Sequence, residues 1–251
     1  HNSVFLLIGL IFFFFLYNNL SHKEYIIILL LLILISFISL LLFKTHDDFH
    51  YYHFPYSYYL TQFPALIGIG QFNHGFRTPS SIFYINSLFY LPAVKFYMFQ
   101  MAAFLIFLYL DIILISKLIK DNVSKRFNFL TFYYLLSFIF INIFFYRISE
   151  HGTDRSAQIL ILILIGEILS FINFKVKIEN YISKLLLLIA LIISLKAFYV
   201  LYIIFFSIIF LRLIQFNNIK IITYYIFSNL YLYLFVLLFF LIIIINFINT
   251  G

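Results

Sequence analysis

The feature that most constrains this chain is a series of apolar runs, each about as long as a helix that crosses a lipid bilayer. The hydrocarbon core takes about 20 residues of α-helix. Hydrophobic residues make up 65% of the 251 residues and charged residues only 10%, a balance that excludes an ordinary soluble domain. We therefore predict an all-α fold, a polytopic transmembrane bundle of about seven to eight membrane helices. The predicted spans are Val4–Leu20, Tyr25–Phe43, Phe96–Ser116, Phe127–Tyr146, Ser156–Phe174 and Ile221–Asn246.

A further apolar run, Leu185 to Leu211, is interrupted by a single charge. Its break falls at Ser194-Leu195-Lys196. Two readings fit this run, a thin hairpin with Lys196 at its tip or one long helix. We favour the hairpin, because a lysine in the middle of a membrane is costly.

Alternation of the spans sorts the loops between two sides. Loops on one side carry ten of the sixteen Lys and Arg residues, and loops on the other carry six. The excess of positive charge predicts that the first side is cytoplasmic. The loop of residues 44–95 then lies outside, together with the polar segment from Arg147 to Arg155, Lys196 and the C-terminal end. The whole chain, 1–251, is predicted to be a single transmembrane domain, a fragment of a longer chain.

Charge and cysteine content exclude several classes of function. The chain has no Cys, so thiolate metal sites and cysteine nucleophiles are excluded. Its net charge of +7 is spread over short loops beside the membrane, which predicts a lipid bilayer as partner and no nucleic acid. The sequence does not indicate an oligomeric state.

The most polar stretch, HDDFHYYHFP, opens the long outer loop. Asp47 and Asp48 directly follow a predicted span, where carboxylates are unfavourable at a helix C-terminus. An acidic group at a membrane rim can act as a general base toward an acceptor hydroxyl. Alternatively, the two aspartates are a solvated end of the helix.

Three histidines accompany these aspartates. His46, His50 and His53 are spaced four and three apart, so on an α-helix they share a face, which is compatible with a metal site. A divalent metal is therefore a possible cofactor, although no cofactor is certain. Tyrosine and histidine are also ordinary residues of a membrane interface, and that alternative stays open.

The rest of the outer loop divides into two halves. Phe49 to Phe63 is aromatic-rich and predicts a helix lying in the membrane interface. The stretch GIGQFNHGFRTPSS then offers glycines for tight turns, and Asn73 and Arg77 as hydrogen-bond donors. Ser80 and Ser81 are candidate caps for a helix over Ile82–Leu91.

Other polar residues of the outer side complete the candidate site. Glu150 and His151 lie in the segment RISEHGTDRSAQ, where Asp154 is either a site residue or a helix cap. Lys196, with apolar residues on both sides, is a candidate for binding a phosphate, as is Arg77. Asp111 and Glu167 lie inside predicted spans. A proton relay is conceivable for them, but pairing with a nearby Lys or an interfacial position is favoured.

At these residues the chain resembles the GT-C superfamily of membrane glycosyltransferases, most closely bacterial members of unassigned substrate. DDFHYYHFP opens the long outer loop, GIGQFNHGFRTPSSIFYINSLF follows it, and EHGTDRSAQ and the Lys196 break come later. The similarity covers roughly residues 45 to 200. Such enzymes take a sugar from a polyprenyl phosphate donor on the non-cytoplasmic face. The chain departs from the pattern in being short, with no soluble domain for an acceptor.

The resemblance implies roles for particular residues. Asp47 or Asp48 would be the catalytic base, with the residue order of the motif favouring Asp48, and Arg77 and Lys196 would hold the donor phosphate. The substrate cavity would be lined by His53, Asn73, Glu150 and Asp154. His50 and His151 are further substrate-binding candidates from their place among these polar residues, apart from the resemblance. The implied location is the bacterial inner membrane, with the site facing the non-cytoplasmic side.

A transporter or flippase for a lipid-linked or anionic solute is the alternative. It would use the same cations without chemistry, and its charges should line a path through the membrane. The charges of this chain gather on one predicted side, which favours the enzyme. A structural membrane subunit is a third reading, disfavoured by the acids and histidines.

Overall fold

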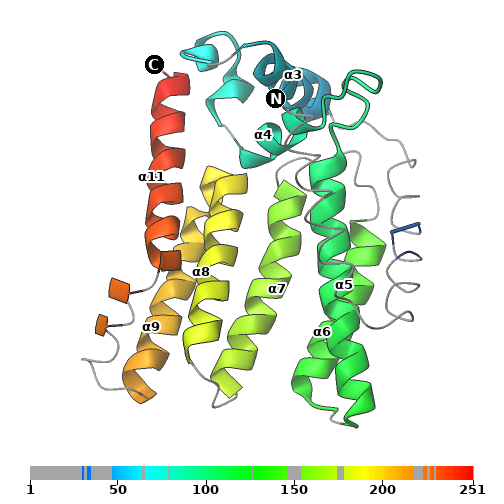
Figure 1. Cartoon of the computed structure of the whole chain (residues 1–251), viewed down its shortest axis with the longest axis vertical. Helices are drawn as coiled ribbons and strands as arrows, with labels where there is room; N and C mark the ends of the chain where they lie inside the picture. The colour runs from blue at the N-terminus through cyan, green and yellow to red at the C-terminus, as the bar shows by residue number, and fades with distance from the viewer. Residues whose placement is uncertain are drawn as a thin grey trace.

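Long helices run side by side and carry short helical segments across one end (Figure 1). The computed structural model describes residues 30, 33–34, 47–63, 66–78, 80–125, 127–145, 154–173, 178–216, 223–224, 227–228 and 230–250. These residues form helices joined by turns, with a single isolated bridge between Leu91 and Lys95. The predicted all-α fold is confirmed for this part of the chain. The long helices are α5 (Met101–Val123), α6 (Phe129–Phe144), α7 (Asp154–Asn173), α8 (Ile178–Leu195), α9 (Ile204–Phe216) and α11 (Leu230–Thr250).

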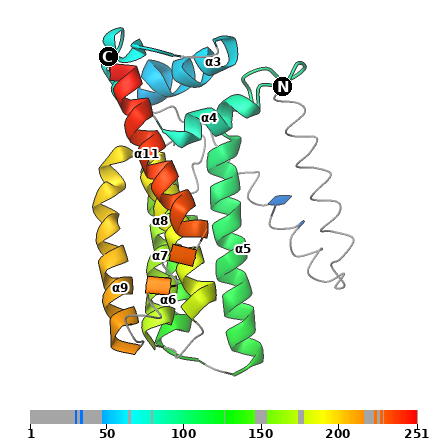
Figure 2. The same cartoon turned by 60° about the vertical axis from the view of Figure 1, so that its left-hand side comes forward.

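The short segments at one end form a cap over the bundle, which we define as residues 47–89. Figure 2 shows the cap helices α3 and α4 lying across the ends of the long helices. The predicted interfacial helix over Phe49 to Phe63 forms as two joined segments, a π-helix and then α3, with Pro55 in the first turn of α3. The cap consists of η1 (Phe49–His53), α3 (Phe54–Gln62), η2 (Ile69–Gln71), η3 (His74–Arg77) and α4 (Ser81–Leu88).

Helix α4 begins as its sequence predicts and ends earlier. The Ser80 side chain accepts a hydrogen bond from the backbone N–H of Ile82, at 3.3 Å, which satisfies one of the free N–H groups of the first turn. The helix stops at Leu88 rather than Leu91. A proline disfavours helical conformation in the residue before it. Pro92 therefore explains why the helix cannot continue past Leu91, but it does not explain why the helix already ends three residues earlier.

The chain turns back at Lys196, as the hairpin reading predicts. Helix α8 ends at Leu195, and Lys196 has an extended backbone (φ −158°, ψ 131°). The 3₁₀-helix η5 (Ala197–Ile203) and α9 then return alongside α8, as both views show (Figures 1 and 2). The reading of one long helix is wrong. Lys196 consequently stands at the same end of the bundle as the cap.

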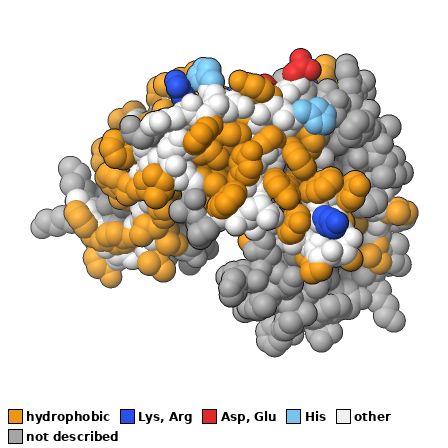
Figure 3. All heavy atoms as spheres, turned by 90° about the horizontal axis from the view of Figure 1, so that it is seen from above, with side chains coloured by type: hydrophobic (Ala, Val, Ile, Leu, Met, Phe, Trp, Pro, Cys, Tyr) orange, Lys and Arg blue, Asp and Glu red, His pale blue; other side chains and the backbone are white. Residues whose placement is uncertain are grey.

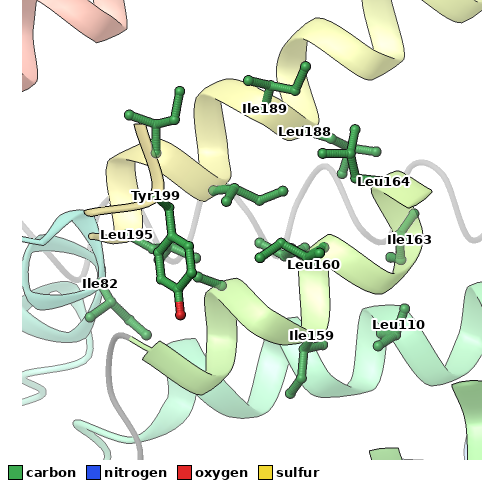
Figure 4. Close-up of a cluster of buried hydrophobic side chains, with 14 of the residues drawn as sticks. Ile82, Leu110, Ile159, Leu160, Ile163, Leu164, Leu188, Ile189, Leu195 and Tyr199 are labelled. Atoms are coloured by element: carbon green, nitrogen blue, oxygen red, sulfur yellow. The ribbon is translucent and has the colours of Figure 1, made fainter. Parts of the chain in front are cut away.

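Helix α7 forms the centre of the core. Its Leu160 and Leu164 are almost wholly inaccessible to solvent, and they lie between α8 and α5. Figure 4 shows Leu188 and Ile189 of α8 on one side of α7 and Leu110 of α5 on the other. Ile82 of α4 reaches the same cluster, so the cap and the bundle share one apolar core.

The outer faces of the long helices are also apolar. On α6, large hydrophobic side chains are exposed along the whole helix: Phe129, Phe132, Leu135, Leu136, Ile139, Phe140, Ile143 and Phe144. Two described helices are long and apolar enough to cross a membrane, Met101–Asn122 and Asp154–Ile172, and three shorter apolar helices accompany them. The number of about seven to eight spans stays a prediction, and the predicted spans Val4–Leu20 and Tyr25–Phe43 lie almost entirely outside the described residues.

Candidate functional site

Two residues from separate predicted outer loops meet where the long helices reach the cap. Asp154 begins α7 and Lys196 follows α8, and the Lys196 Nζ lies 2.5 Å from the Asp154 Oδ2. Both side chains remain partly exposed. The Tyr199 hydroxyl donates a hydrogen bond to the backbone carbonyl of Asp154, at 3.4 Å. The start of α7 and the end of α8 thus hold a carboxylate and an ammonium group in contact with each other.

A tyrosine from the cap lies beside this ion pair. Tyr52 follows Asp48 by four residues in continuous helix, so the two lie about one turn apart. Burial, followed by the negative charges of Asp48 and Asp154, raises the pKa of Tyr52 to about 12. Both carboxylates therefore act on one neutral phenol. Asp48, Tyr52, Asp154 and Lys196 make up the group that we call the acidic junction.

The structure holds Tyr52 from the neighbouring η3 segment. The Asn73 side chain accepts from the Gly75 N–H at 2.8 Å and donates to the Tyr51 backbone carbonyl at 3.1 Å. Gly75 packs directly under the tyrosine ring, since an ideal Cβ at Gly75 would lie 2.5 Å from the Tyr52 Cγ. The predicted substrate-binding residue Asn73 thus has both ends of its amide engaged, the oxygen in capping η3 and the nitrogen in joining η3 to η1.

A hydroxyl pair links the cap to the bundle near this group. Ser81, the first residue of α4, shares a hydrogen bond of 2.8 Å with Ser194, the penultimate residue of α8. The Ser194 hydroxyl also reaches the backbone carbonyl of Leu191, at 2.7 Å. The end of α8 that carries Lys196 is therefore fixed to α4.

Arg77 takes a different position from the one expected. Its Nε donates to the Gly70 carbonyl at 3.1 Å, beside the end of α11. Within the described part of the chain, no hydrogen bond or ion pair joins Arg77 to the acidic junction. Arg77 and Lys196 were both expected to bind the donor phosphate. The hydrogen bond of Arg77 instead fixes its side chain to the cap backbone.

The cap is docked onto the end of α11 by this same segment. The Gly68 N–H donates to the Ile248 carbonyl at 2.9 Å, and the Asn249 amide donates to the Tyr56 hydroxyl at 2.6 Å. Gly68 has φ +68°, a conformation that glycine adopts at little cost. An ideal Cβ at Gly70 would lie 2.7 Å from the Asn249 carbonyl oxygen. The glycines noted in the sequence thus allow a close approach of two backbones.

His50 and His53, two of the three histidines of the predicted metal-binding face, differ in exposure. His50 is exposed, whereas His53 is buried with its ring 4.3 Å from the Tyr52 ring and 5.3 Å from the Phe83 ring. The turn is a π-helix, which winds more widely than the α-helix that the spacing argument assumed. His46 lies outside the described residues, and no group of three His, Asp or Glu able to hold a metal occurs within them.

The remaining candidates divide between the surface and the part of the chain that is not described. Asp47 is exposed and Asp48 is half-buried. Glu150 and His151 lie outside the described residues. Figure 3 shows the capped end as a mainly hydrophobic surface with a few isolated charged and histidine side chains.

Two acids lie inside the bundle, away from the cap. Asp111 is buried in α5 and accepts a hydrogen bond of 3.1 Å from the Asn142 amide of α6. Glu167 is buried in α7, and its Oε1 lies 2.5 Å from the Lys117 Nζ and 2.9 Å from the Lys184 Nζ. The favoured prediction of pairing with lysine is confirmed for Glu167 but not for Asp111, whose described partner is an amide.

Sequence reasoning missed Tyr52 and Gly75 as parts of the candidate site. The chain has 21 tyrosines, so a single tyrosine carries no signal of its own. Its position four residues after Asp48 was the available indication.

Comparison with known proteins identifies no relative, since no family model, no curated protein and no solved structure matches the chain.

Proposed function

We propose that this chain is an integral membrane glycosyltransferase of the GT-C type. It would transfer a sugar from a polyprenyl phosphate donor to an acceptor on the non-cytoplasmic face of the bacterial inner membrane. The observation that carries the proposal is the acidic junction, where the half-buried carboxylate of Asp48 and the Asp154 carboxylate paired with Lys196 both act on Tyr52, at the capped end of an apolar bundle. This group combines a general base with a cation for a leaving phosphate.

The outer surface of the bundle supports the membrane part of the proposal. Soluble monomers rarely expose continuous apolar patches of more than a few hundred Å². Here exposed hydrophobic side chains follow the outer faces of α6, α9 and α11, whereas Asp111 and Glu167 are buried. Polar groups inside and apolar groups outside suit a helical bundle in lipid.

The proposed chemistry is a displacement at the anomeric carbon of the donor sugar. Asp48 takes the proton of the acceptor hydroxyl, whose oxygen forms the new glycosidic bond. The bond between the anomeric carbon and the phosphate oxygen breaks, and polyprenyl phosphate leaves with the electron pair. Lys196 is the candidate that stabilises the developing phosphate charge. To do so, its ammonium group must share or exchange its contact with Asp154.

A flippase or transporter of a lipid-linked or anionic solute is the second candidate. The observation that favours it is the charge inside the bundle, where Glu167 and two lysines join α5, α7 and α8. A transport path needs polar groups at membrane depth. The pairing of these groups with each other fits a structural contact equally well, so we rank this candidate second.

The test is sugar transfer by purified protein from a panel of polyprenyl phosphate sugars. We expect transfer by wild type, loss of at least about 100-fold in Asp48→Asn, and a smaller effect in the exposed Asp47→Asn. Asn keeps the shape of Asp but cannot accept a proton. Full activity in both variants would exclude these aspartates as the base.

A second arm separates the two candidates. The same protein is reconstituted in vesicles, and movement of the donor lipid across the bilayer is measured without an acceptor. Movement with no transfer to any acceptor would favour the flippase, and transfer without movement would favour the enzyme.

A further inference from the structure

Within the described residues, the hydroxyl of Tyr52 is a hydrogen-bond donor of the acidic junction that has no partner. It makes no hydrogen bond with a described residue, although the charges of Asp48 and Asp154 both act on it. The raised pKa means that the phenol keeps its proton at neutral pH. A protonated phenol can donate one hydrogen bond.

The ring of Tyr52 is fixed by its neighbours. It packs closely against Gly75, where an added Cβ would come within 2.6 Å of the Tyr52 Cβ, Cγ and Cδ1. It meets the His53 ring edge-on at 4.3 Å and the Phe83 ring edge-on at 6.3 Å. Asn73 holds the Gly75 turn against this helix. The hydroxyl is thus presented from a rigid support, as a binding group requires.

We propose that Tyr52 binds the sugar ring of the donor by donating its phenolic hydrogen bond to a sugar hydroxyl oxygen. Asp48 and Asp154 would accept hydrogen bonds from neighbouring sugar hydroxyls, so one phenol and two carboxylates would hold the ring. This inference rests on the proposed function and assigns a binding residue to it.

The charges at the junction favour a sugar over a phosphate as the group bound by Tyr52. Two carboxylates act on this phenol, and they repel a phosphate but accept hydrogen bonds from hydroxyls. The cation of the junction, Lys196, directly follows α8 and pairs with the Asp154 carboxylate. Lys196 thus suits the donor phosphate, and Tyr52 suits the neutral part of the same molecule.

The experiment compares Tyr52→Phe with Tyr51→Phe, using the donor on which wild type is active. Tyr51 is the exposed neighbour, and the structure assigns its hydroxyl no part in the junction. We expect Tyr52→Phe to lower kcat/KM by about tenfold through KM, as the loss of one hydrogen bond to substrate predicts. Tyr51→Phe should change kcat/KM by less than about twofold. The thermal unfolding temperature should match wild type in both, because each variant keeps its ring.

A second variant tests the support for the ring. Gly75→Ala forces the ring of Tyr52 to move, so it should lower kcat/KM at least as far as Tyr52→Phe does. In the Tyr52→Phe background the hydroxyl is already absent. Gly75→Ala should therefore lower kcat/KM by a smaller factor there than it does in wild type. Equal, additive losses would mean that Gly75 acts independently of the hydroxyl, and would overturn the inference.

The outcomes separate this inference from the proposed function. If wild type transfers a sugar and Tyr52→Phe has an unchanged KM, the inference is overturned while the proposed function stands. If wild type transfers no sugar from any donor of the panel, the proposed function is overturned and the inference falls with it.

Discussion

At the scale of single residues, lone polar groups in apolar surroundings determine the geometry of the capped end. Lys196 ends α8 and forms the tip of the hairpin, and it pairs with Asp154. The cost of a charge in a membrane predicts the tip from the sequence. It does not predict the partner, because Asp154, Asp47 and Asp48 were equivalent candidates until the helices were placed.

Tyr52 gives a prediction for alkaline pH. Its pKa is raised from 10.0 to about 12, so between these values the unfolded chain releases this proton and the folded protein keeps it. The unfolded state then binds fewer protons, and the stability of the fold must fall as pH rises through this window. We expect the thermal unfolding temperature of wild type to fall more steeply between pH 10 and 12 than that of Tyr52→Phe.

The measurement is thermal unfolding in detergent at intervals of pH from 8 to 12. Tyr51→Phe is the control, because it removes a hydroxyl from the exposed neighbouring residue. Parallel curves for wild type and Tyr52→Phe would show that Tyr52 ionises alike in both states, and so would contradict the prediction.

At the scale of helices, buried contacts between side chains far apart in sequence decide which elements are neighbours. Periodicity and helix caps predict α4 through its Ser80 cap, and the capping box of α6, formed by Asn128 and Thr131, follows the same chemistry. Periodicity and caps do not predict that Glu167 forms ion pairs with lysines of two other helices. The spacing of the histidines also could not predict the π-helix η1, because the prediction assumed an α-helix.

The Glu167 contact predicts a difference between two lysines of α5. Lys117 pairs with Glu167 and donates to the Tyr134 hydroxyl at 3.0 Å, whereas Lys120 is exposed. Removing one partner of a buried pair leaves a charge uncompensated and costs up to about 3–5 kcal/mol. With the Lys117 side chain 25% exposed and Lys184 still present, we expect about 1–2 kcal/mol for Lys117→Gln.

The same substitution at Lys120 is the matched control and should cost less than about 0.5 kcal/mol. Both variants are followed by thermal unfolding in the same detergent. A Lys117→Gln protein as stable as Lys120→Gln would mean that Lys184 alone satisfies Glu167.

At the scale of the whole molecule, the cap and the turn between α5 and α6 lie at opposite ends of the bundle (Figure 1). The sorting of charged loops predicts two sides but leaves open how the outer residues pack together. That packing depends on contacts such as Ser81–Ser194 and Gly68–Ile248, which join residues far apart in the sequence and have no distinctive sequence pattern. The broad architecture was therefore predictable, and the acidic junction only in part.

The orientation in the membrane can be tested with single cysteines, because the chain contains none. Phe72 is 88% exposed in the cap, and Lys125 is exposed in the turn between α5 and α6. We expect a membrane-impermeant maleimide to label Phe72→Cys in intact spheroplasts and Lys125→Cys only after permeabilisation. Cysteine-free wild type is the background control, and the reverse pattern would put the cap on the cytoplasmic side.

The docking of α11 onto the cap has a consequence for how the protein is made. The hydrogen bond between Asn249 and Tyr56 joins residues 193 positions apart, so the partner of the cap leaves the ribosome long after the cap itself. Closing so wide a loop is slow compared with forming neighbouring helices. Until α11 has been synthesised, the cap lacks its hydrogen bond to Asn249. The cap, which carries Asp48 and Tyr52 of the acidic junction, would therefore complete its packing only after α11 is in place.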